Sequence, residues 1–298
     1  MTAIVLLALS LGLGLADARA SDAPAGGTGR PCECRDYAAG VAGAQEIFDS
    51  RSAGAALPLT EAAHTVFAAR VNQAYDLAVC LVACDAAPAR ERNHARRILA
   101  ATAYKSRDSG VPEREVKRRL RLAEQEMERC LALEPDDPEC ITWHASARGR
   151  LAQFSWSPLL ITMPRSLLAE FRAARGDLAP GGDLRDGAAT RGEASILLKA
   201  PSLLGGDRAA ARALMEAASA GARFRCSITN RVLLAETRVL TGETDQGLAE
   251  LRATVADGLP NCALQRYENL SALEEAQRCL QRIEAEPTLA TTWPHECE

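Results

Sequence analysis

Ten cysteines are the residues of this chain whose chemistry is easiest to define. Thiols form disulfides, bind soft metal ions or exchange electrons, and their spacing favours one of these roles. The closest pairs are the C-x-C of Cys32 and Cys34 and the C-x3-C of Cys80 and Cys84. Neither resembles the paired C-x2-C knuckles of a zinc ribbon or the C-x-x-C of a thioredoxin. Because the number is even, we expect disulfides, and a metal or redox role is the alternative.

Chain geometry limits which cysteines can form disulfides with one another. An extended C-x-C places its two Cα atoms about 6.5 Å apart and a helical C-x3-C about 6 Å apart, so two parallel bridges match both spacings. These bridges would join the N-terminal arm to the helix that carries Cys80. The segment between Cys130 and Cys140 is predicted to be a turn between two helices, which brings the two residues within bridging range. The other four cysteines pair by elimination, Cys226 with Cys262 and Cys279 with Cys297.

Patterns for catalysis or cofactor binding are absent from the sequence. There is no G-x-S-x-G, H-E-x-x-H, P-loop or helix-opening G-x-G-x-x-G. The glycine pairs at 181–182 and 205–206 are predicted turns, because no strand precedes them to build a phosphate cradle. The histidines are too dispersed to form a recognisable ligand set, at His64, His94, His144 and His295. We therefore predict a protein that is not an enzyme and has no cofactor and no metal.

The most unusual stretch is 154–180. It begins with the apolar segment FSWSPLLITMP, whose two prolines rule out a single regular helix. A short amphipathic helix over 165–175 and a glycine-rich loop over 176–190 are predicted to follow. Its apolar residues either line a groove for an apolar ligand or a partner peptide, or fill the core between two blocks of helices, which is the favoured interpretation. The same two interpretations apply to the Trp-His pair on the helix before it. The candidate binding residues are Trp143, His144, Phe154, Trp156 and Met163.

Two stretches, 90–97 and 114–121, are rich in arginine. On an exposed helix such a stretch is normally a solvated face that pairs with nearby glutamates. The alternative is that the guanidinium groups bind an acidic partner peptide or the carboxylate of a solute.

The composition indicates the fold class. The 298 residues are 47% hydrophobic and 25% charged, which is enough for one or two ordinary cores. A net charge of -4 lacks the basic excess that a phosphate backbone requires, so nucleic acid is excluded as a partner. Aromatic residues make up only 4%, and alanine is abundant, which favours close-packed helices over a β-sandwich. We expect an all-α protein.

The start of the chain predicts its compartment. Residues 4–15, IVLLALSLGLGL, have the length and apolar character of a signal-peptide core, and Ala18-Arg19-Ala20 has the A-x-A form of a cleavage site. We predict a signal peptide over 1–20 that is cleaved after Ala20, followed by a flexible arm over 21–35 with the C-x-C. No second long apolar stretch follows, so the mature chain is expected to be periplasmic or secreted, with no transmembrane segment.

Helical periodicity covers most of the remaining chain. A helix over 60–83 begins at a Thr N-cap, a second spans 93–104, a third runs from Pro112 to Leu133, and a fourth opens at Asp137-Pro138-Glu139. The first of these helices carries one apolar face. Its members recur at steps of three and four: Phe67, Val71, Ala74, Tyr75, Ala78 and Leu81.

The helices carry a repeat. Residues 123–135, AEQEMERCLALEP, have the spacing of the second helix of a tetratricopeptide repeat: a small residue, a bulky residue, a second small residue and a closing proline. The connection to the helix before it is roughly ten residues longer than in the usual 34-residue unit. The segment 233–260 resembles the repeat over its whole length, and 192–221 matches it in part. We therefore predict a right-handed tetratricopeptide-like solenoid of helical hairpins over 36–298, with an irregular central insertion. Its units are 93–154, 191–223 and 226–260, and its terminal cap is 267–283.

The stretch 191–221, with its helix, proline, Gly-Gly-Asp turn and second helix, resembles the T-component family of TRAP transporters. That resemblance implies a periplasmic α-helical protein that assists solute uptake beside a substrate-binding protein. We accordingly expect a non-catalytic scaffold that binds a partner protein or a small solute, with an accessory role in uptake as the narrower version. The alternative is a cysteine-based metal-handling or redox protein on a helical scaffold.

Overall fold

The computed structural model describes residues 34–154, 163–176, 184–221, 223–262, 265–291 and 293. All regular secondary structure in these residues is helical, which confirms the all-α class. Within the same residues no helix has both the length and the hydropathy needed to span a bilayer. The predicted signal peptide and nearly all of the arm lie outside the described residues. The helices are α1 (Tyr37–Asp49), α2 (Glu61–Val82), α3 (Glu91–Lys105), α4 (Glu113–Leu133), α5 (Pro138–Ala152), α6 (Met163–Arg175), α7 (Leu184–Lys199), α8 (Arg208–Ser219), α9 (Ile228–Leu240), α10 (Thr244–Asp257) and α11 (Arg266–Ala285).

Helix starts follow the capping residues that the sequence provides. The hydroxyl of Thr60 accepts a hydrogen bond from the N–H of Ala63 at 3.2 Å and begins α2. All six residues of the predicted apolar face of α2 are buried. The carboxylate of Asp137 accepts from the N–H of Cys140 at 2.7 Å, and Pro138 is the first residue of α5. These local signals therefore predicted both ends of α2 and the start of α5 to within one or two residues.

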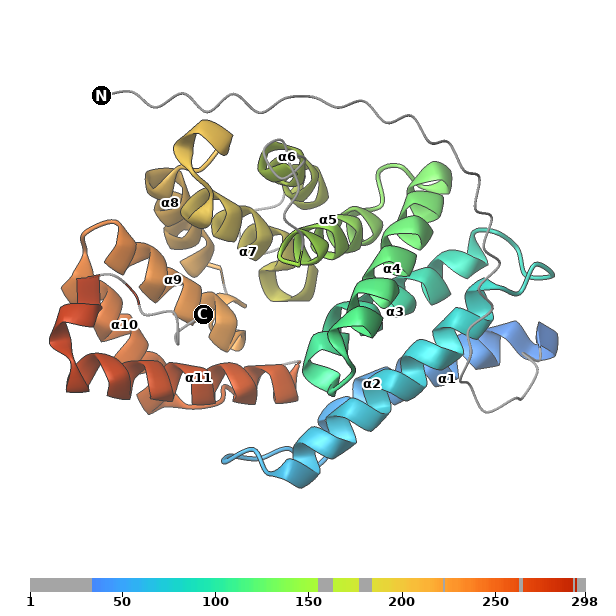
Figure 1. The fold of residues 1–298 in the computed structure, drawn as a ribbon, viewed down its shortest axis with the longest axis horizontal. Coiled ribbons are helices and arrows are strands. Elements are labelled where there is room, and N and C mark those ends of the chain that lie inside the picture. The colour runs from blue at the N-terminus through green and yellow to red at the C-terminus, as the bar shows by residue number, and fades with distance from the viewer. Residues whose placement is uncertain are drawn as a thin grey trace, which may run out of the picture. The chain divides into compact units, whose positions relative to one another are not determined.

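The helices stack as hairpins in chain order (Figure 1). Each helix packs against the next, and the odd-numbered helices α1, α3, α5, α7, α9 and α11 also contact one another in succession. Packing of the first helix of each hairpin against the first helix of the next is the arrangement by which helical-hairpin arrays build a continuous core. The range 93–154, predicted as one unit, contains α3, α4 and α5, whereas 191–223 contains the later part of α7 with α8, and 226–260 contains α9 and α10. Helix α7 begins at Leu184, inside the predicted glycine-rich loop 176–190, so that loop is shorter than predicted.

Small residues stand where two backbones meet. A Cβ on Gly247 of α10 would lie 2.7 Å from the carbonyl oxygen of Ala235 on α9. A Cβ on Gly206 would lie 1.7 Å from the carbonyl oxygen of Ala200. Gly206 lies in the turn before α8, and the carboxylate of Asp207 caps the start of that helix. Gly247, which the repeat spacing predicts as a small position, is thus a position of close backbone approach, and so is the predicted turn residue Gly206.

One disulfide joins α4 to α5, and two others join residues of short 3-10 helices to the segments that follow α2 and α10. The observed pairs agree with the predicted ones, and Cα atoms are 5.2 to 6.2 Å apart. Two more cysteines are also disulfide-bonded, and none of the described cysteines is free. Because a sulfur in a disulfide is not a thiolate, cysteine-based metal binding has no ligands among the described cysteines. The bridges between described residues are Cys34–Cys84, Cys130–Cys140 and Cys226–Cys262. Cys80 and Cys279 are also bonded, and their predicted partners, Cys32 and Cys297, lie outside the described residues.

The last helix returns to the first hairpin. The helix predicted as a terminal cap over 267–283 is present as α11 and packs against α9 and α10, and it also contacts the short 3-10 helix η2 (Ser50–Ser52) and, through Tyr267, helix α2. The rings of Phe67 and Tyr267 stack with centroids 3.9 Å apart, and Arg51 Nε lies 2.8 Å from a carboxylate oxygen of Glu268. Lys105 contributes a second cation 3.5 Å from the same carboxylate. We refer to these contacts as the closing contact.

Candidate functional site

The predicted binding residues do not gather at one place. Trp143 is 7% exposed, and its ring packs in the core with its centroid 5.9 Å from that of Tyr104, so it is a packing residue. Met163, at the start of α6, packs half-buried against the cluster between α5 and α6. Trp156 lies outside the described residues. Phe154 lines a pocket.

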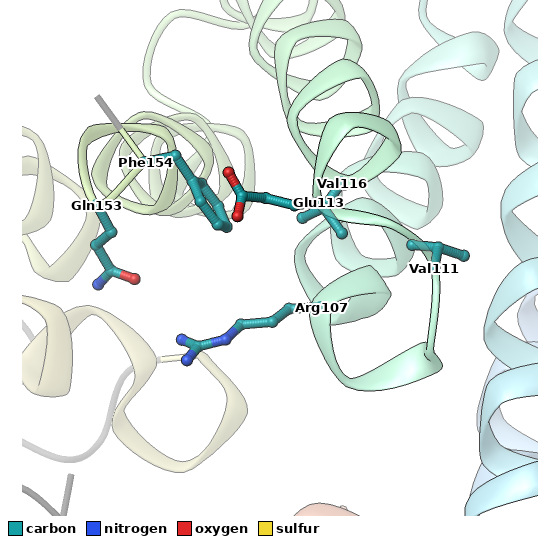
Figure 2. A pocket seen from close by; sticks show the side chains of 6 residues that line it. All are labelled: Arg107, Val111, Glu113, Val116, Gln153 and Phe154. Atoms are coloured by element: carbon teal, nitrogen blue, oxygen red, sulfur yellow. The ribbon is translucent and has the colours of Figure 1, made fainter. Parts of the chain in front are cut away.

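This pocket lies between the end of α5 and the long connection from α3 to α4 (Figure 2). Its volume is about 420 Å³. Phe154 and the valine side chains form its apolar part, and the guanidinium group of Arg107 reaches across toward Gln153. Arg107 makes no hydrogen bond or ion pair within 4 Å among the described residues, although its charge partly offsets the rise that burial causes in the pKa of Glu275 on α11. The pocket is lined by Arg107, Val111, Glu113, Val116, Gln153 and Phe154.

The charge balance of the pocket suits an anion. Glu113 is already paired with Lys117 Nζ at 2.5 Å, and the same ammonium group lies 5.3 Å from the centroid of the Phe154 ring. The free guanidinium of Arg107 therefore has its donor fork available for a carboxylate. An anion with an adjoining apolar group would meet both walls of this pocket.

A second polar cluster surrounds His144, on α5. Its Nδ1 lies 2.8 Å from Glu170 on α6, and Arg148 also pairs with Glu170. Burial alone would raise the pKa of Glu170, but the hydrogen bond with His144 and the charge of Arg148 outweigh it, so the pKa falls below its ordinary value. One ring nitrogen of His144 and one carboxylate oxygen each from Glu124 and Glu128 lie within 4.8 Å of one another. These are residue types that bind divalent metal ions.

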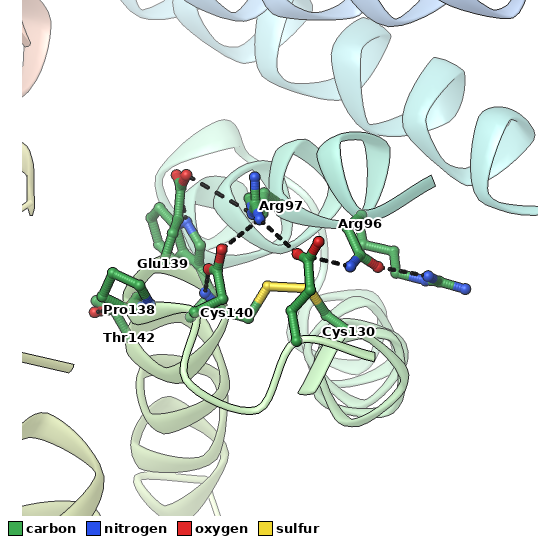
Figure 3. Close-up of polar contacts among 11 residues, drawn as sticks. Arg96, Arg97, Cys130, Pro138, Glu139, Cys140 and Thr142 are labelled. Carbon is green, nitrogen blue, oxygen red and sulfur yellow. Dashed lines mark hydrogen bonds and ion pairs between the residues drawn. A yellow bond between two sulfur atoms is a disulfide. The ribbon is translucent and has the colours of Figure 1, made fainter. Parts of the chain in front are cut away.

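The arginine-rich stretch 90–97 is used within the structure (Figure 3). Arg96 Nε pairs with Glu126 at 3.1 Å, and both side chains are almost fully buried. Arg97 Nη2 lies 3.1 Å from Glu134 and 2.5 Å from Asp137, beside the disulfide between α4 and α5. These guanidinium groups hold α3 against α4 and α5, so they are not available for an acidic ligand.

No family model, curated protein or solved structure matches this chain. The sequence pattern did not predict Arg107 or the pair Glu124 and Glu128 as site residues. The one available signal was the i,i+4 spacing of the two glutamates, which many solvated helix faces share.

Proposed function

We propose that this chain is a non-catalytic scaffold of tetratricopeptide-like hairpins that acts in the periplasm or outside the cell. In this proposal it binds an anionic group of a partner protein or small solute in the pocket at Arg107. The observation that carries the binding role is the unpaired guanidinium of Arg107 opposite the ring of Phe154. The repeat type is supported by the succession of contacts among the odd-numbered helices and by the close approach at Gly247.

The proposed compartment is supported by the cysteines. Every described cysteine is disulfide-bonded, and disulfides persist in oxidising compartments. The predicted cleavage after Ala20 is consistent with export.

An accessory role in solute uptake is the narrower form of the proposal. Its support is the resemblance of 191–221 to the T-component family of TRAP transporters. The partner in that case is the substrate-binding protein of an uptake system, and an acidic surface on that protein would suit Arg107.

The pocket is tested by calorimetric titration of the purified full chain with phenylacetate and with a short oligoglutamate peptide. We expect one of these anions to bind, and Arg107→Ala to weaken that binding by at least about tenfold because a charge-assisted hydrogen bond is lost. Phe154→Ala should weaken phenylacetate more than the peptide. Arg114→Ala is the matched control, because Arg114 is an exposed arginine in the same region that does not line the pocket. Equal binding by the Arg107 and Arg114 variants, or no binding by the wild type, would contradict the proposed site.

A further inference from the structure

We propose that Glu124, Glu128 and His144 form a binding site for one divalent first-row transition-metal ion, where α4 and α5 pack together. Glu170, on α6, is the carboxylate that orients the imidazole ring. The metal site is separate from the proposed scaffold function and does not depend on it.

The first support is the placement of the three ligands. Glu124 and Glu128 are one helical turn apart on α4, so they share a face, and His144 joins them from α5. Their ligand atoms lie within 4.8 Å of one another. Ligands of tetrahedral Zn²⁺ are roughly 3.5 Å apart, so a shift of about 1 Å in the carboxylates completes the set. Glu128 is exposed and can supply that shift by a change of rotamer.

The second support is the state of the imidazole ring. Its Nδ1 lies 2.8 Å from Oε2 of Glu170, so an Nδ1–H group can donate a hydrogen bond to this carboxylate. Its Nε2 is buried and has no hydrogen-bond partner among the described residues. A carboxylate that fixes the ring through Nδ1 and leaves Nε2 as a ligand is the usual arrangement around protein-bound metal ions.

The third support is local charge. Glu124, Glu128 and Glu170 contribute three carboxylates, whereas Arg148 is one cation, which pairs with Glu170 and lies 3.7 Å from Glu124. The balance remains negative and attracts a divalent cation. An imidazole together with carboxylates favours Zn²⁺, Co²⁺ or Mn²⁺ over Mg²⁺ and Ca²⁺, which prefer oxygen ligands alone.

The experiment uses the untagged full chain after treatment with chelator. Titration calorimetry with ZnCl₂, and the visible absorption of added Co²⁺ as an independent spectroscopic readout, should show one ion per chain. Glu128→Gln and His144→Asn should each weaken Zn²⁺ binding by about tenfold or more and reduce the Co²⁺ bands. Glu128→Gln keeps the test valid if His144→Asn fails to fold, because Glu128 is exposed. His94→Asn is the matched control, since His94 is an exposed histidine outside the cluster.

Three results would overturn the site. The first is that the wild type binds neither Zn²⁺ nor Co²⁺. The second is that the Glu128→Gln and His144→Asn variants bind these ions as the wild type does. The third is that His94→Asn weakens metal binding as much as those two substitutions do. Failure of the metal site would leave anion binding at Arg107 unaffected, so the two proposals are tested separately.

Discussion

At Gly206 there is no room for a β-carbon, whereas at Gly43 on α1 nothing lies within 4 Å of one. The obstacle at Gly206 is the carbonyl oxygen of Ala200, a backbone atom that cannot move aside unless the turn opens. We expect Gly206→Ala to lower the free energy of unfolding by about 1–3 kcal/mol. Gly43→Ala is expected to raise it by about 0.5–1 kcal/mol, because alanine favours the helix. Urea unfolding measures both, and a Gly206→Ala protein as stable as the wild type would contradict the close approach.

Residues with a strong local constraint were predictable from the sequence, and residues of an assembled site were not. Chain geometry alone predicted that Cys130 pairs with Cys140, ten residues away. His144 acquires its role from Glu124 and Glu170, which belong to two other helices, and no local spacing links the three. The sequence therefore named His144 as a candidate binding residue beside Trp143 but supplied no metal-ligand set for it.

At the scale of elements, helix ends were predictable because their signals are local caps and prolines. It was harder to predict which residues of a helix lie in the core when other helices cover that helix on several sides. Helix α5 packs against α3, α4, α6 and α7, so it has no single polar face that reveals which residues are core. This is why the sequence left two roles open for Trp143, which the structure places in the core.

The disulfide between α4 and α5 provides a test at this scale. Cys130 and Cys140 are fully buried and lie ten residues apart. The double substitution Cys130→Ala and Cys140→Ala should lower the free energy of unfolding by about 2–3 kcal/mol, chiefly because the unfolded chain loses a short cross-link. Guanidinium unfolding measures the change. A loss below about 0.5 kcal/mol would contradict a stabilising cross-link between these two helices.

At the scale of the whole molecule, the closing contact was not predictable. Arg51 and Glu268 are 217 residues apart in the sequence, and each reads locally as an ordinary charged residue near a helix end. Helical periodicity shows which face of α11 is apolar but not which helix will cover it. The partner depends on how each hairpin is set against the next, which the repeat pattern does not specify.

The closing contact predicts a pH dependence. Burial alone would raise the pKa of Glu268, but Lys105 and Arg51 outweigh it and hold that pKa below its ordinary value of 4.5. A carboxylate with a lowered pKa stabilises the folded state fully above the ordinary value, and this stabilisation is lost as the pH falls through the lowered one. At neutral pH we expect Glu268→Gln to reduce the free energy of unfolding by about 2–3 kcal/mol, because two cations lose their counter-charge.

The difference between Glu268→Gln and the wild type should shrink steadily below about pH 4.5, as Glu268 becomes protonated in the wild type. Urea unfolding of both proteins from neutral pH to about pH 3 measures it. Glu284→Gln is the matched control, because Glu284 lies on the same helix, is 52% exposed and pairs with Arg252 at 3.4 Å. Its effect should stay within about 0.5 kcal/mol at any pH, since exposed ion pairs contribute little. If Glu268→Gln behaved as this control does, the contact between α11 and the first hairpin would rest on the stacked rings of Phe67 and Tyr267 and not on charge.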